Sequence, residues 1–156
     1  MRVLLQRVAD AWVDIAGRAT PPSGAGLLAL VGFCDGDHEG LLAPMAEKIV
    51  NLRIFEDAQG KLNRSLLDRG GALVLVSQFT LYADLRRGRR PGFSHALAPP
   101  AASRLFDAFV ACCRARVVRV ETGEFGASMR VHLINDGPVT LLLDSAELGM
   151  DSPMNP

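Results

Sequence analysis

"GGALVLVSQFTLYAD", residues 70–84, begins with two glycines, continues as an unbroken apolar run and ends in polar side chains. A short run rich in Val and Leu, placed after a glycine pair, predicts a buried β-strand. The side chains become polar at Ser77, where the strand ends and its backbone becomes available to a ligand. The pattern therefore predicts a sheet with a candidate site at this strand end, where Ser77 and Thr80 supply hydroxyl groups.

Two other apolar segments predict strands, and two helical patterns predict a layer that packs on the sheet. Residues 2–17 alternate between apolar and polar side chains, and residues 26–33 form a second buried run. Between Glu39 and Leu52 the apolar spacing becomes helical. A second helix is expected to open at the Pro99-Pro100 pair, and its apolar stripe consists of Leu105, Phe106, Phe109, Val110 and Cys113.

The segment at residues 116–145 predicts three strands joined by glycine-containing turns. Its "NDGPVT" stretch, residues 135–140, lies between two apolar runs, so it is a candidate hairpin corner. The segment at 53–63 predicts a short strand and a turn at Gly60. Together these elements predict one α+β domain at residues 1–144, with a mostly antiparallel, rolled or barrel-like sheet and two packed helices. Residues 145–156 are expected to form a flexible tail.

Composition limits the classes of function. Basic and acidic residues number 17 each, so the net charge gives no argument for an acidic partner, and any nucleic-acid surface must be local. Three cysteines without CxxC spacing fit a reducing cytoplasm. No apolar stretch approaches the roughly 20 residues that a membrane helix needs, and we expect no membrane association.

The sequence lacks the standard catalytic signatures. It has no GxSxG elbow, no HExxH, no Walker loop and no GxGxxG after a strand. The three histidines, at 38, 95 and 132, are scattered, and we expect ordinary surface or half-buried positions for them and no metal. Ser77 has no sequence-local base, and a serine without a base is a weak nucleophile. If the chain is an enzyme, the attacking group is expected to belong to water or to the substrate.

A cationic loop follows the buried strand. "LRRGRRPGFSH", residues 85–95, gathers Arg86, Arg87, Arg89 and Arg90 ahead of Phe93. A solvated loop is one interpretation. Guanidinium groups beside glycine and an aromatic ring also suit a phosphate backbone and an unstacked base, so RNA is a candidate partner.

Four stretches together indicate a family: "MRVLLQRV" at 1–8, "SQFTLYAD" at 77–84, "RRGRRPGF" at 86–93 and "TGEFGASMRVHLINDGPVT" at 122–140. In this order the sequence resembles the D-aminoacyl-tRNA deacylases from Met1 to about Asp144. The resemblance implies a homodimeric, cytoplasmic esterase without a metal or cofactor. Its substrate is the ester between a D-amino acid, or a glycine mischarged on alanine tRNA, and the 3′ terminal adenosine of a tRNA.

The resemblance also assigns residues. It places the active site at Ser77, Gln78, Phe79 and Thr80, where backbone groups hold the substrate and the adenosine's own 2′-hydroxyl assists hydrolysis. Gly137 and Pro138 match a Gly-cisPro motif that enters the partner subunit's site and rejects L substrates. Phe125 and Met129 match positions that line the adenosine pocket, and Arg7 matches a support of the Gly-Pro loop. The residues available for binding tRNA are Phe125, Met129, Arg7, Arg86, Arg87, Arg89 and Arg90.

This assignment explains the missing catalytic triad, because a site that borrows a hydroxyl from RNA needs mainly positioning and oxyanion donors. A bare glycine backbone beside the α-carbon would exclude an L side chain sterically. Two alternatives stay open. One is a related deacylase of L-threonine on alanine tRNA, against which the "SQFTL" segment argues, and the other is a nucleic-acid-binding protein of the same fold without catalysis.

Overall fold

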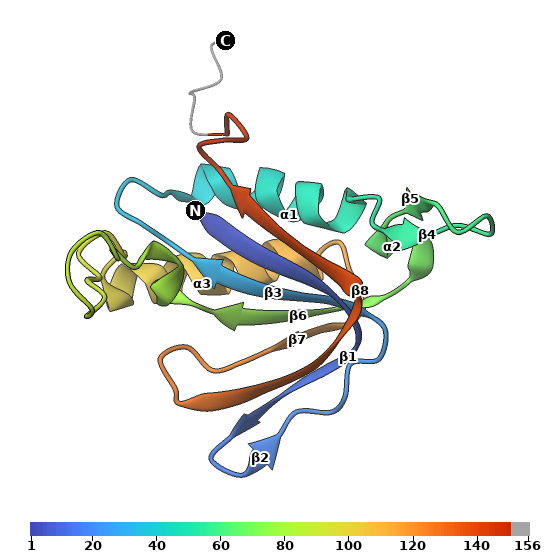
Figure 1. Cartoon of the computed structure of the whole chain (residues 1–156), viewed down its shortest axis with the longest axis horizontal. Helices are drawn as coiled ribbons and strands as arrows, with labels where there is room; N and C mark the ends of the chain where they lie inside the picture. The colour runs from blue at the N-terminus through green and yellow to red at the C-terminus, as the bar shows by residue number, and fades with distance from the viewer. Residues whose placement is uncertain (151–156) are drawn as a thin grey trace.

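Strand β1 (Arg2–Ile15) pairs with three other strands of one sheet. In this computed structural model, which describes residues 1–150, β1 is antiparallel to β2 (Arg18–Ala19), β3 (Gly26–Gly32) and β8 (Met129–Asp144). The order continues from β3 through β6 (Ala72–Ser77) to β7 (Val120–Thr122), and these two pairings are parallel. The sheet is curled, and Figure 1 shows β1, β2 and β8 bending away from the helices.

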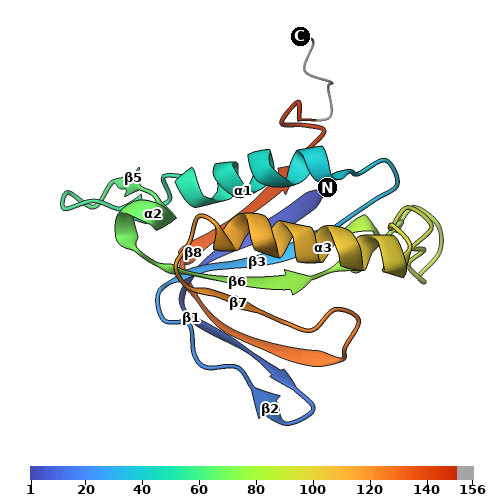
Figure 2. The same ribbon diagram turned by 180° about the vertical axis from the view of Figure 1, so that it is seen from behind.

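Two amphipathic helices cover one face of this sheet, as Figures 1 and 2 show from opposite sides. Helix α1 (Leu42–Asn51) follows the 3₁₀ turn η1 (Glu39–Leu41), and α3 (Pro99–Arg114) begins at the proline pair. Proline suits a first turn, because its missing N–H would have no partner inside the helix. All five residues of the predicted α3 stripe are buried, so the hydrophobic pattern of the sequence is confirmed here.

The apolar core has two parts because the sheet is curled. The larger part lies between the helices and the sheet and contains Leu5, Leu75, Ile49 and Phe109, all fully buried. The smaller part lies on the other face, where Val13 and Val74 are buried and Met129, Val131 and Leu133 of β8 pack against it. None of the helices within residues 1–150 is long and apolar enough to cross a membrane.

Small elements connect the two helical segments to the sheet. Strands β4 (Phe55–Glu56) and β5 (Leu62–Arg64) form a hairpin, and Gly60 N–H donates to Asp57 O in its turn at 3.0 Å. The one-turn helix α2 (Leu66–Arg69) follows, closed by a capping box between Ser65 and Asp68. A 3₁₀ turn, η2 (Phe79–Tyr82), continues directly from β6. The sequence pattern did not predict α2.

The prediction of three strands between residues 116 and 145 is wrong. The structure has β7 and then a single 16-residue strand, β8, which contains "NDGPVT" within its length. The apolar runs on either side of this stretch therefore belong to the same strand, and the hairpin corner does not form. Both runs pair with β1, the first with its C-terminal half and the second with its N-terminal half.

A bulge occupies the place of the expected corner. Gln6 is opposite Thr140 and Val8 is opposite Asn135, so β8 gains residues 136–139 where β1 has only Arg7. Such an insertion leaves residues outside the ladder and bends the strand. Gly137 and Pro138 are exposed, and the bond between them is cis. The stretch is thus a protrusion from the middle of a long strand.

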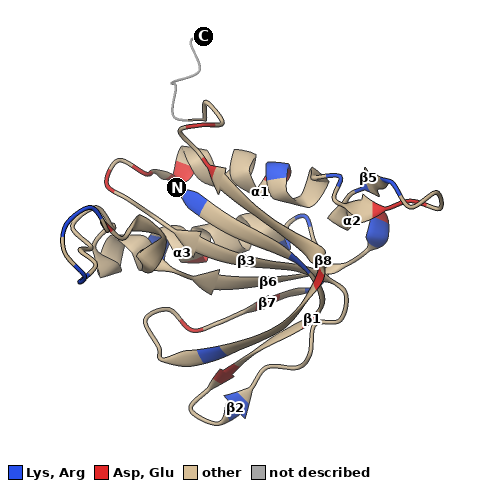
Figure 3. Cartoon of the chain, viewed as in Figure 1, with Lys and Arg blue, Asp and Glu red and all other residues tan. Residues whose placement is uncertain are grey.

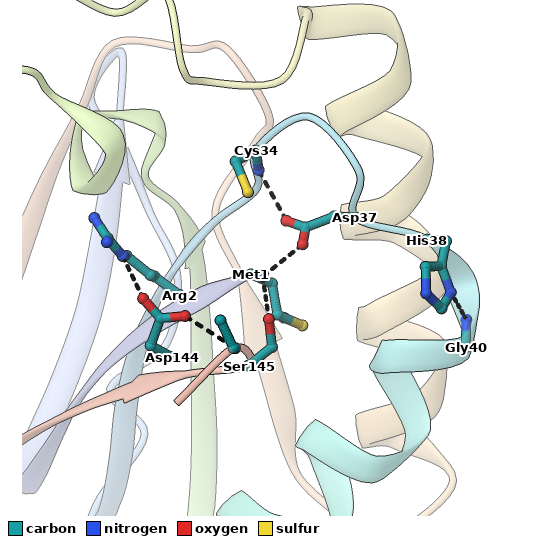
Figure 4. A network of polar contacts seen from close by, with 9 residues as sticks. Met1, Arg2, Cys34, Asp37, His38, Gly40, Asp144 and Ser145 are labelled. Carbon is teal, nitrogen blue, oxygen red and sulfur yellow. Dashed lines mark hydrogen bonds and ion pairs between the residues drawn. The ribbon is translucent and has the colours of Figure 1, made fainter. Parts of the chain in front are cut away.

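The first strand and the end of β8 meet in a polar cluster, shown in Figure 4. The Met1 ammonium donates to Asp37 and to Ser145, each at 2.6 Å, and Arg2 Nε donates to Asp144 Oδ2 at 2.7 Å. Ser145 is buried, and residues 145–150 form turns. Residues 151–156 lie outside the described part of the chain, so the flexible tail expected there stays a prediction.

Candidate functional site

A cavity of about 630 Å³ lies where β6 ends. Its walls come from the ends of β3 and β6, from the loop before α3 and from residues 125–131. Of the residues that the sequence predicted for the site, it brings together Ser77, Gln78, Phe79, Phe125 and Met129. The volume is that of a small-molecule site, and the strand end is the place that the sequence predicted for one.

Hydrogen bonds fix the backbone at the β6–η2 junction, but the N–H groups of Phe79 and Thr80 take no part in them. Gln78 N–H donates to Val31 O at 2.7 Å and Leu81 N–H donates to Gln78 O at 3.3 Å, which holds both ends of the turn. Because a 3₁₀ turn bonds each N–H to the third carbonyl before it, the N–H groups of Phe79 and Thr80 have no acceptor within η2. Phe79 lines the cavity and Thr80, which follows it, does not. Two adjacent backbone donors beside a cavity suit an oxyanion.

The side chains of this segment offer no activated nucleophile. Ser77 is half-buried, and within residues 1–150 no hydrogen bond joins its hydroxyl to a histidine, a lysine or a carboxylate. Gln78 Nε2 donates to Thr80 Oγ1. His38 Nδ1 accepts from Gly40 N–H, and His132 stacks on Trp12 with ring centroids 4.8 Å apart. In the same part of the chain, no group of three His, Cys, Asp or Glu residues could hold a metal ion.

Aromatic and thioether side chains line the cavity at two depths. Phe125 is half-buried, with its ring centroid 6.3 Å from that of Phe106 in the core, and Met129 lies where β8 starts. Phe79 and Phe93 lie further out, with 55% and 38% of their surface exposed, and form an edge-to-face pair with centroids 4.9 Å apart. The inner wall is thus apolar and packed, while the rim carries two open rings.

Arg7 holds the bulge of β8 from beneath. Its side chain is almost entirely buried, and Nε donates to Asp136 O at 3.0 Å while Nη1 donates to Ile54 O at 2.7 Å. Asp136 also places its carboxylate 3.3 Å from Nε. From the other side, Asn135 Nδ2 donates to Arg7 O and Val139 O at 2.9 and 3.1 Å. The expected contact between Arg7 and the Gly-Pro loop is therefore present.

The bulge and the cavity are separate within one chain. None of Arg7, Gly137 and Pro138 lines the cavity, so one copy does not bring its Gly-Pro stretch to its own pocket. Gly137 has a φ of +132°, and a Cβ there would lie 2.9 Å from Val139 N and 3.1 Å from Arg7 Nη2. Only glycine fits this backbone without displacement.

The four arginines differ in their partners. Arg86 forms two hydrogen bonds with the Asp84 carboxylate, at 2.9 and 2.7 Å, and these hydrogen bonds hold the pKa of Asp84 far below its ordinary value. Arg87, Arg89 and Arg90 are exposed, and within residues 1–150 no carboxylate lies within 4 Å of them. Figure 3 shows this loop as a concentration of positive charge beside the start of α3.

Sequence reasoning missed Arg2, which supports η2. Arg2 Nη1 donates to Leu81 O at 3.0 Å, and its guanidinium carbon lies 4.7 Å from the centroid of the Tyr82 ring. Both contacts are with η2, so Arg2 fixes the far end of the turn that presents Phe79 and Thr80. Arg2 alternates normally in a strand pattern, and no local signal separates it from any other polar strand residue.

Comparison with known proteins shows the family of this chain. The family model described as "D-Tyr-tRNA(Tyr) deacylase" matches residues 4–144. The chain belongs to this family. It is 57% identical over 148 residues to a protein of Chloroflexus aurantiacus named D-aminoacyl-tRNA deacylase, covering 95% of this chain and 92% of that one. A protein of the same name from Thermus aquaticus is 53% identical over 147 residues, covering 94% and 97%.

Two solved structures share the fold with this family member. One is described as "c-Myc DNA Unwinding Element Binding Protein", with 37% identity, a TM-score of 0.87 and coverage of 93% of this chain and 99% of that one. The other is described as a probable eukaryotic D-amino acid tRNA deacylase, with a TM-score of 0.81, 18% identity and coverage of 91% and 97%. The second likeness shows the fold alone.

Proposed function

We propose that this chain is a D-aminoacyl-tRNA deacylase, which hydrolyses the ester between a D-amino acid and the terminal adenosine of tRNA. One observation carries the proposal: the cavity lies at the β6–η2 junction, where the N–H groups of Phe79 and Thr80 have no acceptor within η2 and Ser77 has no base. The names of relatives at 57% and 53% identity support the same activity. Glycine mischarged on alanine tRNA is a second substrate, because it too lacks an L side chain.

The chemistry then needs only positioning and electrostatics. The ester carbonyl oxygen lies against the N–H groups of Phe79 and Thr80, which stabilise its negative charge as water adds to the carbonyl carbon. The ester C–O bond breaks, and the departing ribose oxygen takes a proton. The neighbouring 2′-hydroxyl of the same adenosine assists by exchanging protons and hydrogen bonds with the reacting groups. The products are the free D-amino acid and tRNA, and Ser77 forms no covalent bond.

A homodimer would bring the bulge to the cavity. The outer edge of β8 has no strand partner within residues 1–150, and its side chains include Ile134 and Leu142 with 57% and 58% of their surface exposed. A long, apolar edge strand favours association with a second copy, and two-fold pairs are the commonest assembly. We propose that this pairing places Gly137 and Pro138 of one subunit in the cavity of the other. A chain that light scattering shows to be monomeric at assay concentrations, and that is fully active there, would contradict the proposed dimer.

Discrimination between D and L substrates follows from that placement. Gly137 and Pro138 are exposed, and Arg7 and Asn135 hold the backbone on either side of them. We propose that the carbonyl groups of Gly137 and Pro138 accept hydrogen bonds from the substrate ammonium. A fixed backbone near the α-carbon leaves room for hydrogen and none for an L side chain. D side chains point elsewhere, so the site accepts many of them. Exclusion by clash is a recognised route to specificity.

Nucleic-acid binding without catalysis is a second candidate, because the neighbour at 37% identity is named for binding DNA. The free arginines of the loop suit either nucleic acid. The tRNA reaction explains more of the structure, since DNA binding gives no role to the cavity or to the N–H groups of Phe79 and Thr80. The cytoplasm, where aminoacyl-tRNA is used, is the proposed location, and all three cysteines are free thiols.

The test is hydrolysis of D-tyrosyl-tRNA by the purified chain at neutral pH, followed as release of D-tyrosine. Release above the spontaneous rate, proportional to enzyme and inhibited by an uncleavable amide analogue of D-tyrosyl-adenosine, supports the proposal. A duplex DNA of equal charge is the control competitor, and it should inhibit less. No release above the spontaneous rate would reject the activity and leave DNA binding as the better account.

A further inference from the structure

We propose that Phe79 and Phe93 form a stacking platform for the penultimate base of the tRNA 3′ end, the nucleotide before the terminal adenosine. This inference rests on the proposed function and adds a second nucleotide subsite to it. Phe125 and Met129 line the same cavity as the two rings. If the terminal adenosine lies against Phe125 and Met129, as the proposed function expects, the exposed rings of Phe79 and Phe93 are available to the next nucleotide.

The rings of Phe79 and Phe93 have exposed surface on which a base could stack. Phe79 has 55% and Phe93 has 38% of its surface exposed, although both line the cavity. Their edge-to-face arrangement, with an interplanar angle of 69°, leaves ring faces available for stacking. Bases of single-stranded RNA stack on such rings with little dependence on sequence, because every base has a π-face.

Phe93 is presented by an anchored loop. Before it, Asp84 and Gly92 exchange backbone hydrogen bonds of 2.7 and 2.9 Å. After it, Ala96 N–H donates to Phe93 O at 3.1 Å, and Leu97 N–H donates to Phe33 O at 3.0 Å. The ring therefore sits on a backbone fixed at both ends, so little ordering is needed when a base stacks on it.

Charge identifies the occupant as a nucleotide. Arg87, Arg89 and Arg90 precede Phe93 in the same loop and have no carboxylate partner in the described chain. Phosphates flank the penultimate base on both sides, and a loop that carries both unpaired guanidinium groups and an aromatic ring suits a phosphate next to a base. A D-amino acid side chain would use the rings but not the arginines.

The experiment compares three D-tyrosyl esters: adenosine alone, a cytidine-adenosine dinucleotide, and the same dinucleotide with an abasic first nucleotide. The measured quantity is the kcat/KM of each dinucleotide divided by that of the adenosine ester. The variant is Phe93→Leu, which keeps an apolar side chain and removes the ring. Leu85→Ala is the control, since Leu85 is 72% exposed in the same loop and does not line the cavity.

In the wild type, the base should raise the ratio about 5- to 150-fold over the abasic dinucleotide, the range that one stacked base provides. Phe93→Leu should lower the cytidine ratio towards the abasic value, and Leu85→Ala should keep the wild-type ratio. Equal ratios for cytidine and abasic dinucleotides would overturn the platform and leave a phosphate contact.

Three more results separate the platform from its alternatives. If Phe93→Leu changes the preference between D-tyrosyl and D-alanyl esters of adenosine and keeps the dinucleotide ratio, the rings hold the amino-acid side chain and the proposal is rejected. If the wild type hydrolyses none of the three esters and also leaves D-tyrosyl-tRNA intact, the proposed function itself fails. Activity on the adenosine ester with no gain from the base rejects the platform alone.

Discussion

Gly137→Ala tests the bulge most sharply, because both its strain and its clash can be read from the structure. At a φ of +132° an L residue is rarely stable, and the added Cβ would lie 2.9 Å from Val139 N. Ordinary contacts begin at 3.4 Å, so the bulge backbone must shift by about 0.5 Å. Such backbone strain costs about 1–3 kcal/mol, which lowers the Tm of a chain of this size by about 2–12 °C.

The effect on catalysis should exceed the effect on stability. Misplacement by about 1 Å costs roughly 100-fold in rate, so we expect hydrolysis of D-tyrosyl-tRNA to fall about 10- to 100-fold. The control is Gly60→Ala in the β4–β5 turn, where φ is +74° and nothing lies within 4 Å of the added Cβ. We expect Gly60→Ala to introduce a comparable backbone strain of about 1–2 kcal/mol and to leave the rate of D-tyrosyl-tRNA hydrolysis unchanged.

The assay is single-turnover deacylation of D-tyrosyl-tRNA, with thermal unfolding measured on the same samples. If Gly137→Ala keeps both the wild-type Tm and the wild-type rate, the bulge has room that the structure does not show, and the steric reasoning is refuted. If Gly60→Ala loses as much activity as Gly137→Ala, the loss follows from strain anywhere in the chain and the bulge has no special part.

Three further predictions follow from individual residues. Ser77→Ala should keep substantial deacylation, since no base activates its hydroxyl, and trapping of an aminoacyl-Ser77 ester by mass spectrometry would contradict this. Replacing Arg86, Arg87, Arg89 and Arg90 together with Gln should weaken tRNA binding and flatten its dependence on log salt by about one unit per lost phosphate contact; weaker binding with the wild-type salt slope would make the loop a bystander. Burial raises the pKa of Asp144, but hydrogen bonds from Arg2 and the Ala146 N–H, with the charge of Arg2, outweigh it and leave the pKa below its ordinary value. The stabilisation of at most about 1 kcal/mol is therefore present above the ordinary pKa of about 4 and is lost as the pH falls through the folded value. Asp144→Asn should lower the Tm at pH 7 and approach the wild type in acid, and a difference that stays constant with pH would refute this.

Local patterns predicted the buried layers of the fold well. The Leu105 to Cys113 stripe has helical spacing, which predicts a helix with one buried face. The run at residues 72–77 is apolar up to Ser77, which predicts a strand buried on both faces. The same logic failed at "NDGPVT", because a Gly-Pro pair between apolar runs has the composition of a turn. A bulge within a strand differs from a corner only in what lies opposite, and that partner is Arg7, 130 positions away.

The sequence likewise predicted some features of the site and not others. The strand end at Ser77 could be predicted from the change to polar residues, and the cavity forms there. Arg2 and Tyr82 could not, since their contact depends on the pairing of β1 with β3 and on the turn after β6. The role of the backbone at this site came only from the family resemblance, because backbone N–H groups belong to every residue and leave no mark in a sequence.

The ratio of deacylation rates for D-tyrosyl-tRNA and L-tyrosyl-tRNA, measured on the same tRNA and with the wild-type chain, tests the central claim most directly. If a bare backbone at Gly137 and Pro138 excludes L side chains from a cavity whose donors are the N–H groups of Phe79 and Thr80, the D ester is hydrolysed rapidly. The L ester then decays at its spontaneous rate. Equal hydrolysis of the two esters, or of neither, would contradict the account.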